Sequence, residues 1–397
     1  MQEYEIVPVE EGKDPAATSR ANPTRAFPAK VIQMCVLLFA VCITVSVVSI
    51  YVFRHFGFSS MVTAMGPMKP SHQAPGYKES RGLDRWIKPL PNLIHTMTDQ
   101  ELFRRASLVP RVKKYPFNRV PKIAFMFLTK GPLPLAPLWE RFLKGNEAYY
   151  SVYVHSSPSF RADFPPSSVF FRRQIPSQVA EWGRMSLCDA ERRLLTNALL
   201  DISNEWFVLL SETCIPLYNF TRVYQYINGS RYSFISAFDD PGPFGRGKYN
   251  EKMAPDITLS MWRKGSQWFE VNRRLAISIV EDTKYRSKFE EFCRPVAEFG
   301  RSACFGDEHY FPTMLTIQAA NQLANRSLTW VDWSGGGYHP ATFGREDVSE
   351  ELFKKVGQGA TCLYNDQPTS VCFLFARKFA PSALEPLLLL APTAFGY

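Results

Sequence analysis

The longest uninterrupted apolar stretch of the chain lies near its N-terminus. Residues 31–53 read VIQMCVLLFAVCITVSVVSIYVF, with no charged side chain among them. About 20 apolar residues suffice for a helix to cross the hydrocarbon core of a bilayer. A cleaved signal peptide usually has a shorter apolar region that starts closer to the first residue. The pattern therefore predicts a single membrane-spanning helix, a signal anchor, over residues 31–53.

Basic residues on the two sides of this stretch predict its orientation. Arg54 is the one basic residue that follows it closely, whereas four precede it: Lys13, Arg20, Arg25 and Lys30. Positive residues favour the cytoplasmic side of a membrane. We therefore expect residues 1–30 to form a cytoplasmic tail and the chain after the helix to be lumenal. Residues 54–120 are rich in proline and basic residues without sustained periodicity, which predicts a lumenal stem.

The pattern changes over residues 121–397, which we expect to form the catalytic domain. Apolar runs of strand length alternate with stretches in which apolar residues recur every three to four positions, and this alternation predicts an α/β domain with a mostly parallel central sheet. In the clearest helical stretch, Met185–Leu200, the spacing predicts that Glu191, Arg192 and Arg193 face outward. The predicted strands are residues 123–128, 151–154, 168–171, 206–210, 232–238, 268–271 and 328–333.

The net charge and the cysteines indicate which partners the protein binds and in which compartment it lies. The formal net charge of +9 suggests an anionic partner such as a membrane surface or a phosphorylated ligand, and without a nucleic-acid-binding motif we expect no nucleic acid. Of the eight cysteines, Cys35 and Cys42 lie in the predicted spanning helix. The other six would lie in a compartment that permits disulfides. Short spacing favours the pairs Cys293–Cys304 and Cys362–Cys372, with buried free thiols as the alternative.

Three N-x-[S/T] sequons follow the predicted helix, at Asn219, Asn228 and Asn325. They are candidate N-glycosylation sites and agree with a lumenal domain.

Several common catalytic motifs are absent from the sequence. It contains no G-x-x-x-x-G-K-[ST], no strand-linked G-x-G-x-x-G, no H-E-x-x-H, no G-x-S-x-G and no C-x-x-C. This argues against P-loop NTPases, Rossmann dehydrogenases, zinc proteases and α/β-hydrolases. The six histidines do not pair at metal-ligand spacing, so we expect no metal site.

Two acidic segments are candidates for chemistry. The segment Asp307–His309 precedes a possible helix, Phe311–Ala319, and a carboxylate such as Glu308 in a partly dehydrated cleft can act as a general base. Helix capping is the alternative. Asp239 and Asp240 enter a loop rich in glycine and proline, where they would line an acceptor site, hold a cation bound to a diphosphate, or form a turn.

Two further segments are candidates for ligand binding. Trp330 lies at the end of a predicted strand, before the run Gly335–Gly337, and a tryptophan there offers a flat surface for a sugar ring. Core packing is the alternative. Arg377 and Lys378 follow an apolar run, and paired cations there can hold a diphosphate, with solvated surface charge as the alternative.

Together these segments resemble the core-2/I-branching β-1,6-N-acetylglucosaminyltransferase family, in particular its plant-type branch. The resemblance covers roughly residues 120–385. It rests on Lys122–Gly131, Trp182–Ser186, Phe207–Pro216, Trp262–Glu270, Asp307–His309, His339–Phe343 and Phe375–Phe379. It implies a type II Golgi membrane enzyme with a GT-A-like α/β domain. Such an enzyme transfers a sugar, N-acetylglucosamine by the family's name, from a UDP-sugar to a glycan or glycoprotein, with inversion and without a metal or other cofactor.

The resemblance also implies roles for single residues. Glu308 matches the family's catalytic base, which takes the proton of the acceptor hydroxyl. Lys378 matches the lysine that holds the donor diphosphate, with Arg377 beside it. Trp330 lies where the family has a tryptophan that stacks on the acceptor.

Two positions depart from the pattern of the animal enzymes. Those enzymes share the diphosphate between the lysine and an upstream arginine, but the matching stretch Val356–Cys362 contains no arginine. Either Lys355 or Arg377 would take its place, or the phosphate would be bound more weakly. Their Val-Asp pair at the end of the second strand reads Val154-His155 here. The donor sugar is therefore open among N-acetylglucosamine, xylose and glucuronic acid.

Two other hypotheses remain at this point. One is a non-catalytic carbohydrate-binding or scaffold protein on the same fold, because a fold does not determine a function. The other is a metal-dependent transferase that uses Asp239 and Asp240.

Overall fold

The computed structural model describes residues 33–34, 37–46, 93–112, 115–294, 303–337, 339–357 and 360–397. The chain divides into two compact units, Met1–Tyr77 and Lys78–Tyr397. In the first unit, residues 37–46 are helical and their large apolar side chains are exposed. Within the described ranges, no helix is long and apolar enough to cross a membrane. The rest of the predicted spanning helix, the predicted tail and the predicted stem up to residue 92 lie outside the described residues.

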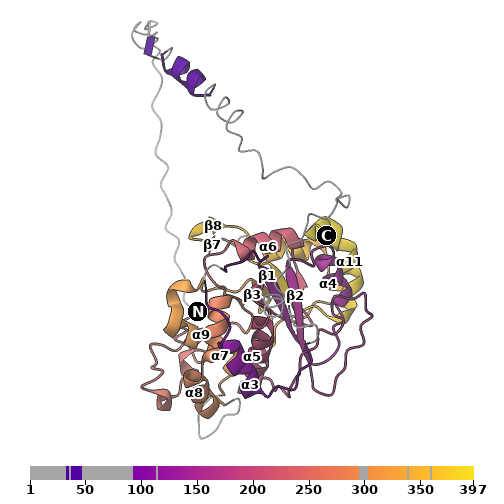
Figure 1. Ribbon diagram of the computed structural model, residues 1–397, viewed down its shortest axis with the longest axis vertical. Coiled ribbons are helices and arrows are strands. Elements are labelled where there is room, and N and C mark those ends of the chain that lie inside the picture. Colours follow the sequence, from indigo (N-terminus) through magenta and orange to yellow (C-terminus); the bar gives the residue numbers. More distant parts are fainter. Residues whose placement is uncertain are drawn as a thin grey trace, which may run out of the picture. The chain divides into compact units, whose positions relative to one another are not determined.

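A four-stranded sheet forms the centre of the second unit (Figure 1). Its order is β2 (Tyr150–His155), β1 (Lys122–Leu128), β3 (Asn204–Ser211) and β5 (Glu270–Asn272). The first three strands run parallel and β5 is antiparallel to β3. The predicted α/β class with a mostly parallel sheet is therefore confirmed.

Both faces of this sheet are covered, as expected for parallel strands. In β1, Ala124, Met126 and Leu128 enter one apolar core, while Ile123, Phe125 and Phe127 enter a second core on the opposite face. Figure 1 shows helices on either side of the strands. The helices that contribute to the first core are α3 (Asp99–Ser107), α5 (Met185–Leu199), α7 (Arg273–Glu281), α8 (Lys284–Phe292) and α9 (Gly306–Ala319); those of the second are α4 (Ala136–Leu143), α6 (Phe220–Asn228), α10 (Glu350–Gly357) and α11 (Leu384–Leu390).

Three small strands form a second sheet beside the first. β9 (Phe375–Arg377) lies between β4 (Ile215–Pro216), which is antiparallel to it, and β6 (Thr329–Val331), which is parallel. This sheet lies next to the carboxyl end of β3. The Phe379 N–H, just after β9, donates to the Thr213 carbonyl, just after β3, at 3.0 Å. The short 3-10 helices are Arg246–Lys248, Glu251–Met253, Ala320–Gln322, Arg345–Asp347 and Pro381–Ala383, and a π-helical turn covers Ala391–Phe395.

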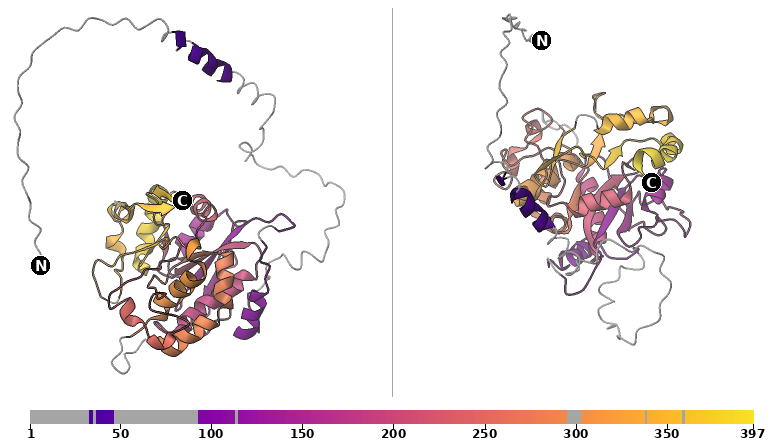
Figure 2. Two further views of the ribbon diagram at one scale, coloured as in Figure 1. Left: turned by 90° about the vertical axis from the view of Figure 1, so that its left-hand side faces the viewer. Right: turned by 90° about the horizontal axis from the view of Figure 1, so that it is seen from above.

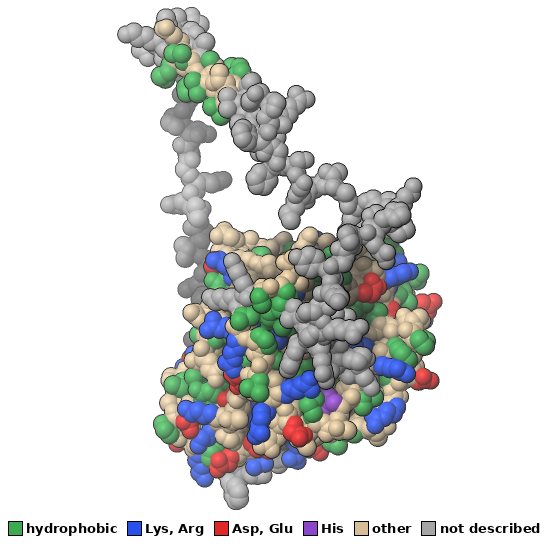
Figure 3. Space-filling model, viewed as in Figure 1, with side chains coloured by type: hydrophobic (Ala, Val, Ile, Leu, Met, Phe, Trp, Pro, Cys, Tyr) green, Lys and Arg blue, Asp and Glu red, His purple; other side chains and the backbone are tan. Residues whose placement is uncertain are grey.

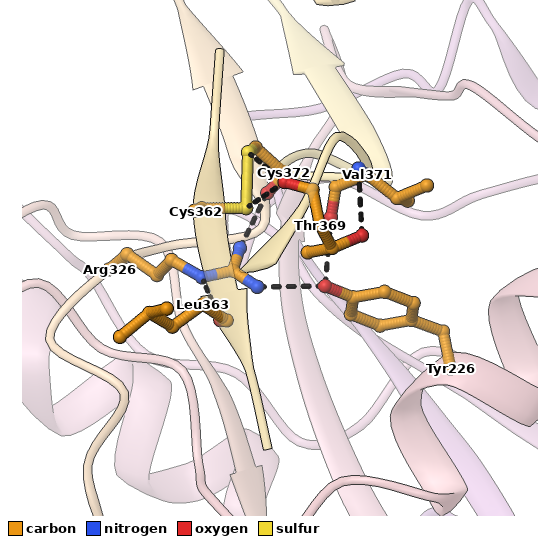
Figure 4. The surroundings of a disulfide bond; sticks show 7 residues. All are labelled: Tyr226, Arg326, Cys362, Leu363, Thr369, Val371 and Cys372. Carbon is orange, nitrogen blue, oxygen red and sulfur yellow. Dashed lines mark hydrogen bonds between the residues drawn. A yellow bond between two sulfur atoms is a disulfide. The ribbon is translucent and has the colours of Figure 1, made fainter. Parts of the chain in front are cut away.

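The two predicted disulfides are present. Cys293 pairs with Cys304, and Cys362 pairs with Cys372 next to the hairpin of β7 (Cys362–Tyr364) and β8 (Gln367–Thr369). Figure 4 shows how Arg326 holds this hairpin, by donating to the Leu363 carbonyl of β7 at 3.3 Å and to the Cys372 carbonyl at 2.6 Å, while it also donates to the Tyr226 hydroxyl at 2.8 Å. The other two cysteines of the domain, Cys188 and Cys214, are buried free thiols.

The expectation that Glu191, Arg192 and Arg193 face outward is wrong. All three are at most 6% exposed, because α3 and α7 cover this side of α5. Arg192 donates to the carbonyls of Val280 and Asp282, Arg193 pairs with Asp99 at the start of α3, and Glu191 accepts from Gln267. Helical periodicity identified the helix but could not show that a second layer of chain packs on its polar side.

Two of the predicted strands are also wrong. Residues 168–171 form turns, and their apolar character is explained by Phe170, which packs edge-on against Phe127. Residues 232–238 form isolated bridges, at Ser233, Phe234 and Phe238, rather than a continuous strand. Burial of apolar side chains does not require a ladder, so an apolar run alone overestimates strands.

Candidate active site

The carboxyl ends of β1, β2 and β3 meet at one edge of the sheet, where ligands bind in open α/β folds. Lys130, His155 and Glu212 lie at or just beyond these ends. His155 is buried, and burial together with Arg193 lowers its pKa to about 4. Its ring is therefore neutral near pH 7, with Nε2 accepting from the Gln178 N–H at 3.3 Å. The position where the animal enzymes have an aspartate thus holds an uncharged ring.

Arg377 and Lys378 bring positive charge to this same edge. Burial lowers the pKa of Lys378, and the nearby charges of Arg377 and Lys130 lower it further, whereas Glu212 opposes the shift. The Arg377 guanidinium lies 4.0 Å from the centre of the Trp268 ring, and its Nε is buried without a hydrogen-bond partner. Cations that are partly dehydrated and incompletely paired favour an anionic ligand. Of the two proposed substitutes for the missing arginine, Arg377 adjoins Lys378 in this cluster, and Lys355 is exposed on α10.

Glu308 lies in the first turn of α9. The helix begins at Gly306 rather than at Phe311, so the expectation that the acidic segment precedes the helix is wrong. An added Cβ at Gly306 would lie 2.6 Å from the Met185 sulfur, so a glycine permits this close start of the helix. The Glu308 side chain is 30% exposed and its Oε2 is ion-paired with Lys264 Nζ. The carboxylate is therefore both held in place and accessible.

The residues on either side of Glu308 are buried. Burial raises the pKa of Asp307 to about 7, and the Glu308 charge adds to this effect. Its Oδ1 has no hydrogen-bond partner, and neither does Oε2 of the buried Glu191, whose charge also interacts with Asp307. His309 stacks on Trp262, its Nδ1–H donates to the Arg263 carbonyl at 2.8 Å, and burial lowers its pKa to about 4. Glu308 is thus the accessible member of the three.

The segment Lys264–Trp268 connects Glu308 with the cations. At one end, Lys264 binds the carboxylate and the Gly265 N–H donates to the Glu308 carbonyl at 2.8 Å. At the other end, the Trp268 ring lies under the Arg377 guanidinium. This one short segment therefore contacts both Glu308 and Arg377.

Asp239 and Asp240 are occupied by local interactions. Asp239 accepts two hydrogen bonds from Arg246, at 2.7 and 2.8 Å, and this pair holds the pKa of Asp239 below its usual range. Asp240 Oδ1 accepts from the Gly242 N–H at 2.7 Å, as expected for a turn. Across the part of the chain that the structure describes, no group of three His, Cys, Asp or Glu side chains is placed to hold a metal ion.

Trp330 stacks on Phe343, with ring centroids 5.8 Å apart, and packs against the second core. It is partly buried, whereas Trp333 in the following loop is 50% exposed. The structure therefore gives Trp330 a packing role in addition to any contact with a ligand.

The three sequon asparagines differ in their surroundings. Asn228 and Asn325 are exposed. Asn219 is partly buried and caps α6, since its side-chain oxygen accepts from the Arg222 N–H at 2.9 Å.

Two residues near Glu308 and its helix, Lys264 and Trp182, lie in segments that carry the family resemblance, but the sequence suggested no role for either. Lys264 reaches Glu308 because the Gly265 N–H next to it donates to the Glu308 carbonyl at 2.8 Å, a contact between residues far apart in the chain. Trp182 lies next to α9, with its ring 4.8 Å from that of Phe305. Periodicity cannot detect such long-range neighbours.

Comparisons with known proteins show to which family the chain belongs. The family model of the Core-2/I-Branching enzyme matches residues 123–357. The chain belongs to this family of enzymes and is a glycosyltransferase. It is 36% identical over 307 residues to glycosyltransferase BC10 of Oryza sativa subsp. japonica, an alignment that covers 67% of this chain and 76% of that protein.

Proposed function

We propose that this protein is an inverting, metal-independent transferase with a GT-A-like domain, which moves a sugar from a UDP-sugar to a glycan or glycoprotein. The observation that carries the proposal is the accessible carboxylate of Glu308, joined by the segment Lys264–Trp268 to the cations Arg377 and Lys378. A base and a cationic site for the leaving group are the two parts that such a reaction needs.

In this mechanism the oxygen of the acceptor hydroxyl forms a bond to C1 of the donor sugar. Glu308 accepts the hydroxyl proton, and Lys264 binds its Oε2 so that the carboxylate stays oriented. The bond between C1 and the diphosphate oxygen breaks, and its electron pair leaves with UDP. Lys378 and Arg377 stabilise the charge that develops on the diphosphate, as a metal ion does in other enzymes.

We propose N-acetylglucosamine as the donor sugar, on the basis of the family's name. Xylose and glucuronic acid are the alternatives, because the neutral His155 replaces an aspartate at the donor edge. Trp330 and the loop of Asp239 and Asp240 would line the acceptor side. The structure engages both aspartates locally, so their contribution would be to shape the loop.

The test measures UDP release by the purified full-length protein over a panel of UDP-sugars, with EDTA present. We expect turnover with one donor and a loss of at least about 100-fold in the Glu308→Gln variant, because a general base contributes 10²- to 10⁴-fold. Glu205→Gln is the matched control, since Glu205 is similarly exposed, at 32%, and is also paired with one cation, Arg119. Full activity of Glu308→Gln would refute the assigned base, and activity that needs a metal would favour the metal-dependent alternative.

A second set of proposals concerns location. We propose a type II Golgi membrane protein with a cytoplasmic tail (1–30), a spanning helix (31–53), a stem (54–120) and a lumenal catalytic domain (121–397). The uncharged sequence of residues 31–53 and the exposed apolar side chains of residues 37–46 support it. We expect the domain to be protected from protease in sealed vesicles and the protein to co-localise with a Golgi marker. We also expect deglycosylation to lower its mass, by less in the Asn228→Gln variant than in the wild type. Cleavage of the domain in intact vesicles would contradict this topology.

A further inference from the structure

A partly exposed group of aromatic rings lies at the start of α9, the helix whose first turn carries Glu308. Trp182 precedes α5, Phe305 directly precedes α9, and His339 belongs to the loop that follows β6. The ring centroid of Trp182 is 4.8 Å from that of Phe305 and 5.5 Å from that of His339. Trp182 nevertheless remains 52% exposed. Three segments far apart in the sequence therefore converge on an aromatic surface that is open to solvent.

This surface has a defined position relative to the candidate base. The Glu308 N–H donates to the Phe305 carbonyl at 3.3 Å, so Phe305 and Glu308 belong to the same turn. The Gly306 N–H lies 3.5 Å from the Gly183 carbonyl, which ties the Trp182 segment to the start of α9. These two backbone contacts tie the Trp182 segment to the turn of α9 that carries Glu308.

The loop that carries His339 is closed at its base. The Ala341 N–H donates to the Asp332 carbonyl at 2.9 Å, and Gly336 and Gly337 have the positive φ values of 66° and 85° that favour glycine. His339 is exposed at the end of this loop, against the Trp182 ring. On the face that Figure 3 shows, Lys and Arg side chains are scattered among other side chains rather than gathered in one patch.

We propose that Trp182, Phe305 and His339 form a subsite that stacks on a pyranose ring of the acceptor glycan. A sugar ring presents a face of C–H groups that packs on an aromatic face, while its hydroxyls stay at the rim. The charged end of the donor belongs with Arg377 and Lys378, whereas a sugar stacked here would offer its hydroxyl to Glu308. This inference rests on the proposed function, because it assigns the acceptor of the same reaction.

The experiment uses the full-length protein and a printed array of neutral mono- and oligosaccharides, probed with UDP present. The glycan that binds best is then titrated against the wild type, Trp182→Ala, Trp182→Phe and Tyr149→Ala. Tyr149 is the matched control, because it is an exposed aromatic residue that contacts another ring, Tyr224, but precedes β2 at the opposite edge of the sheet. Thermal melting checks that each variant is folded, and a UDP titration checks the donor side.

We expect Trp182→Ala to weaken glycan binding about tenfold, which corresponds to about 1.4 kcal/mol, and to leave UDP binding unchanged. Trp182→Phe should retain most of the affinity, and Tyr149→Ala all of it. Unchanged glycan affinity in folded Trp182→Ala, an equal loss of UDP affinity, or no glycan bound by the wild type would each overturn the subsite. Failure of the proposed function gives a different result, namely glycan binding that depends on Trp182 without any Glu308-dependent turnover.

Discussion

Replacement of Asp307 by asparagine should make the protein more stable at high pH than the wild type. Burial raises the pKa of Asp307 from an ordinary 3.8 to about 7. The folded state therefore holds this proton more tightly than the unfolded state, and the free energy of unfolding falls as the pH rises from about 4 through about 7. Asparagine carries no such proton, so this fall disappears.

The size of the effect follows from the shift. A difference of about 3 pKa units corresponds to about 4 kcal/mol in full, of which about 3 kcal/mol lies between pH 4.5 and pH 8. For a domain of roughly 300 residues, this corresponds to about 5 °C in melting temperature. The asparagine side chain can itself change the free energy of unfolding, because its amide replaces a carboxyl whose Oδ1 has no hydrogen-bond partner. This contribution is the same at both pH values, so it cancels when the difference between variant and wild type is compared at the two pH values.

Urea unfolding of the full-length wild type and of Asp307→Asn, followed by tryptophan fluorescence at pH 4.5 and pH 8, measures the difference. Asp189→Asn is the matched control. It removes a charge from the neighbouring helix α5, but Arg286 donates to both Asp189 oxygens, at 2.8 and 2.6 Å, so this variant should be less stable than the wild type at pH 8. If the difference between Asp307→Asn and wild type changes by less than about 1 kcal/mol over this pH range, the reasoning from burial is refuted.

Three further predictions concern the donor site, a disulfide and the docking of α3. Lys378→Met should lower kcat at least about 100-fold, measured as UDP release, whereas Lys378→Arg should keep part of the activity; equal losses would count against a role of charge. Cys304→Ser removes the disulfide with Cys293, which closes a loop with a sequence separation of 11, and should lower the free energy of unfolding, measured in urea, by about 3 kcal/mol. The difference from the wild type should vanish if reductant is present throughout. Asp99→Asn breaks the pair with the buried Arg193 and should speed hydrogen exchange in α3 by about tenfold while leaving α4 unchanged.

Much of the fold could be predicted from local pattern. The strands β1, β2 and β3 are short apolar runs, buried on both faces, and each was predicted within one or two residues of its bounds. The failures at residues 168–171 and 232–238 share a cause, because apolar side chains there are buried without a continuous ladder. The outward assignment of Glu191 failed because α5 is covered on its polar side as well.

The candidate site divides in the same way. Glu308, Lys378 and Arg377 were proposed as site residues from their residue types and from the order of motifs along the chain, which a sequence contains. No role was suggested for Lys264 or Trp182, because their contacts with Glu308 and Phe305 join residues 44 and 123 positions apart in the chain.

The sequence by itself determined the class of fold and the family and favoured the two disulfide pairs, because each depends on local spacing, on apolar periodicity or on the order of short motifs. Only the tertiary structure decided that Glu308 is accessible while Asp307 and His309 are buried, although the three are consecutive. It also decided that Asp239 and Asp240 are engaged within their own loop. The exposure, the ion pairs and the pKa of a side chain depend on which distant segments of the chain pack around it, and this environment exists only in the folded protein.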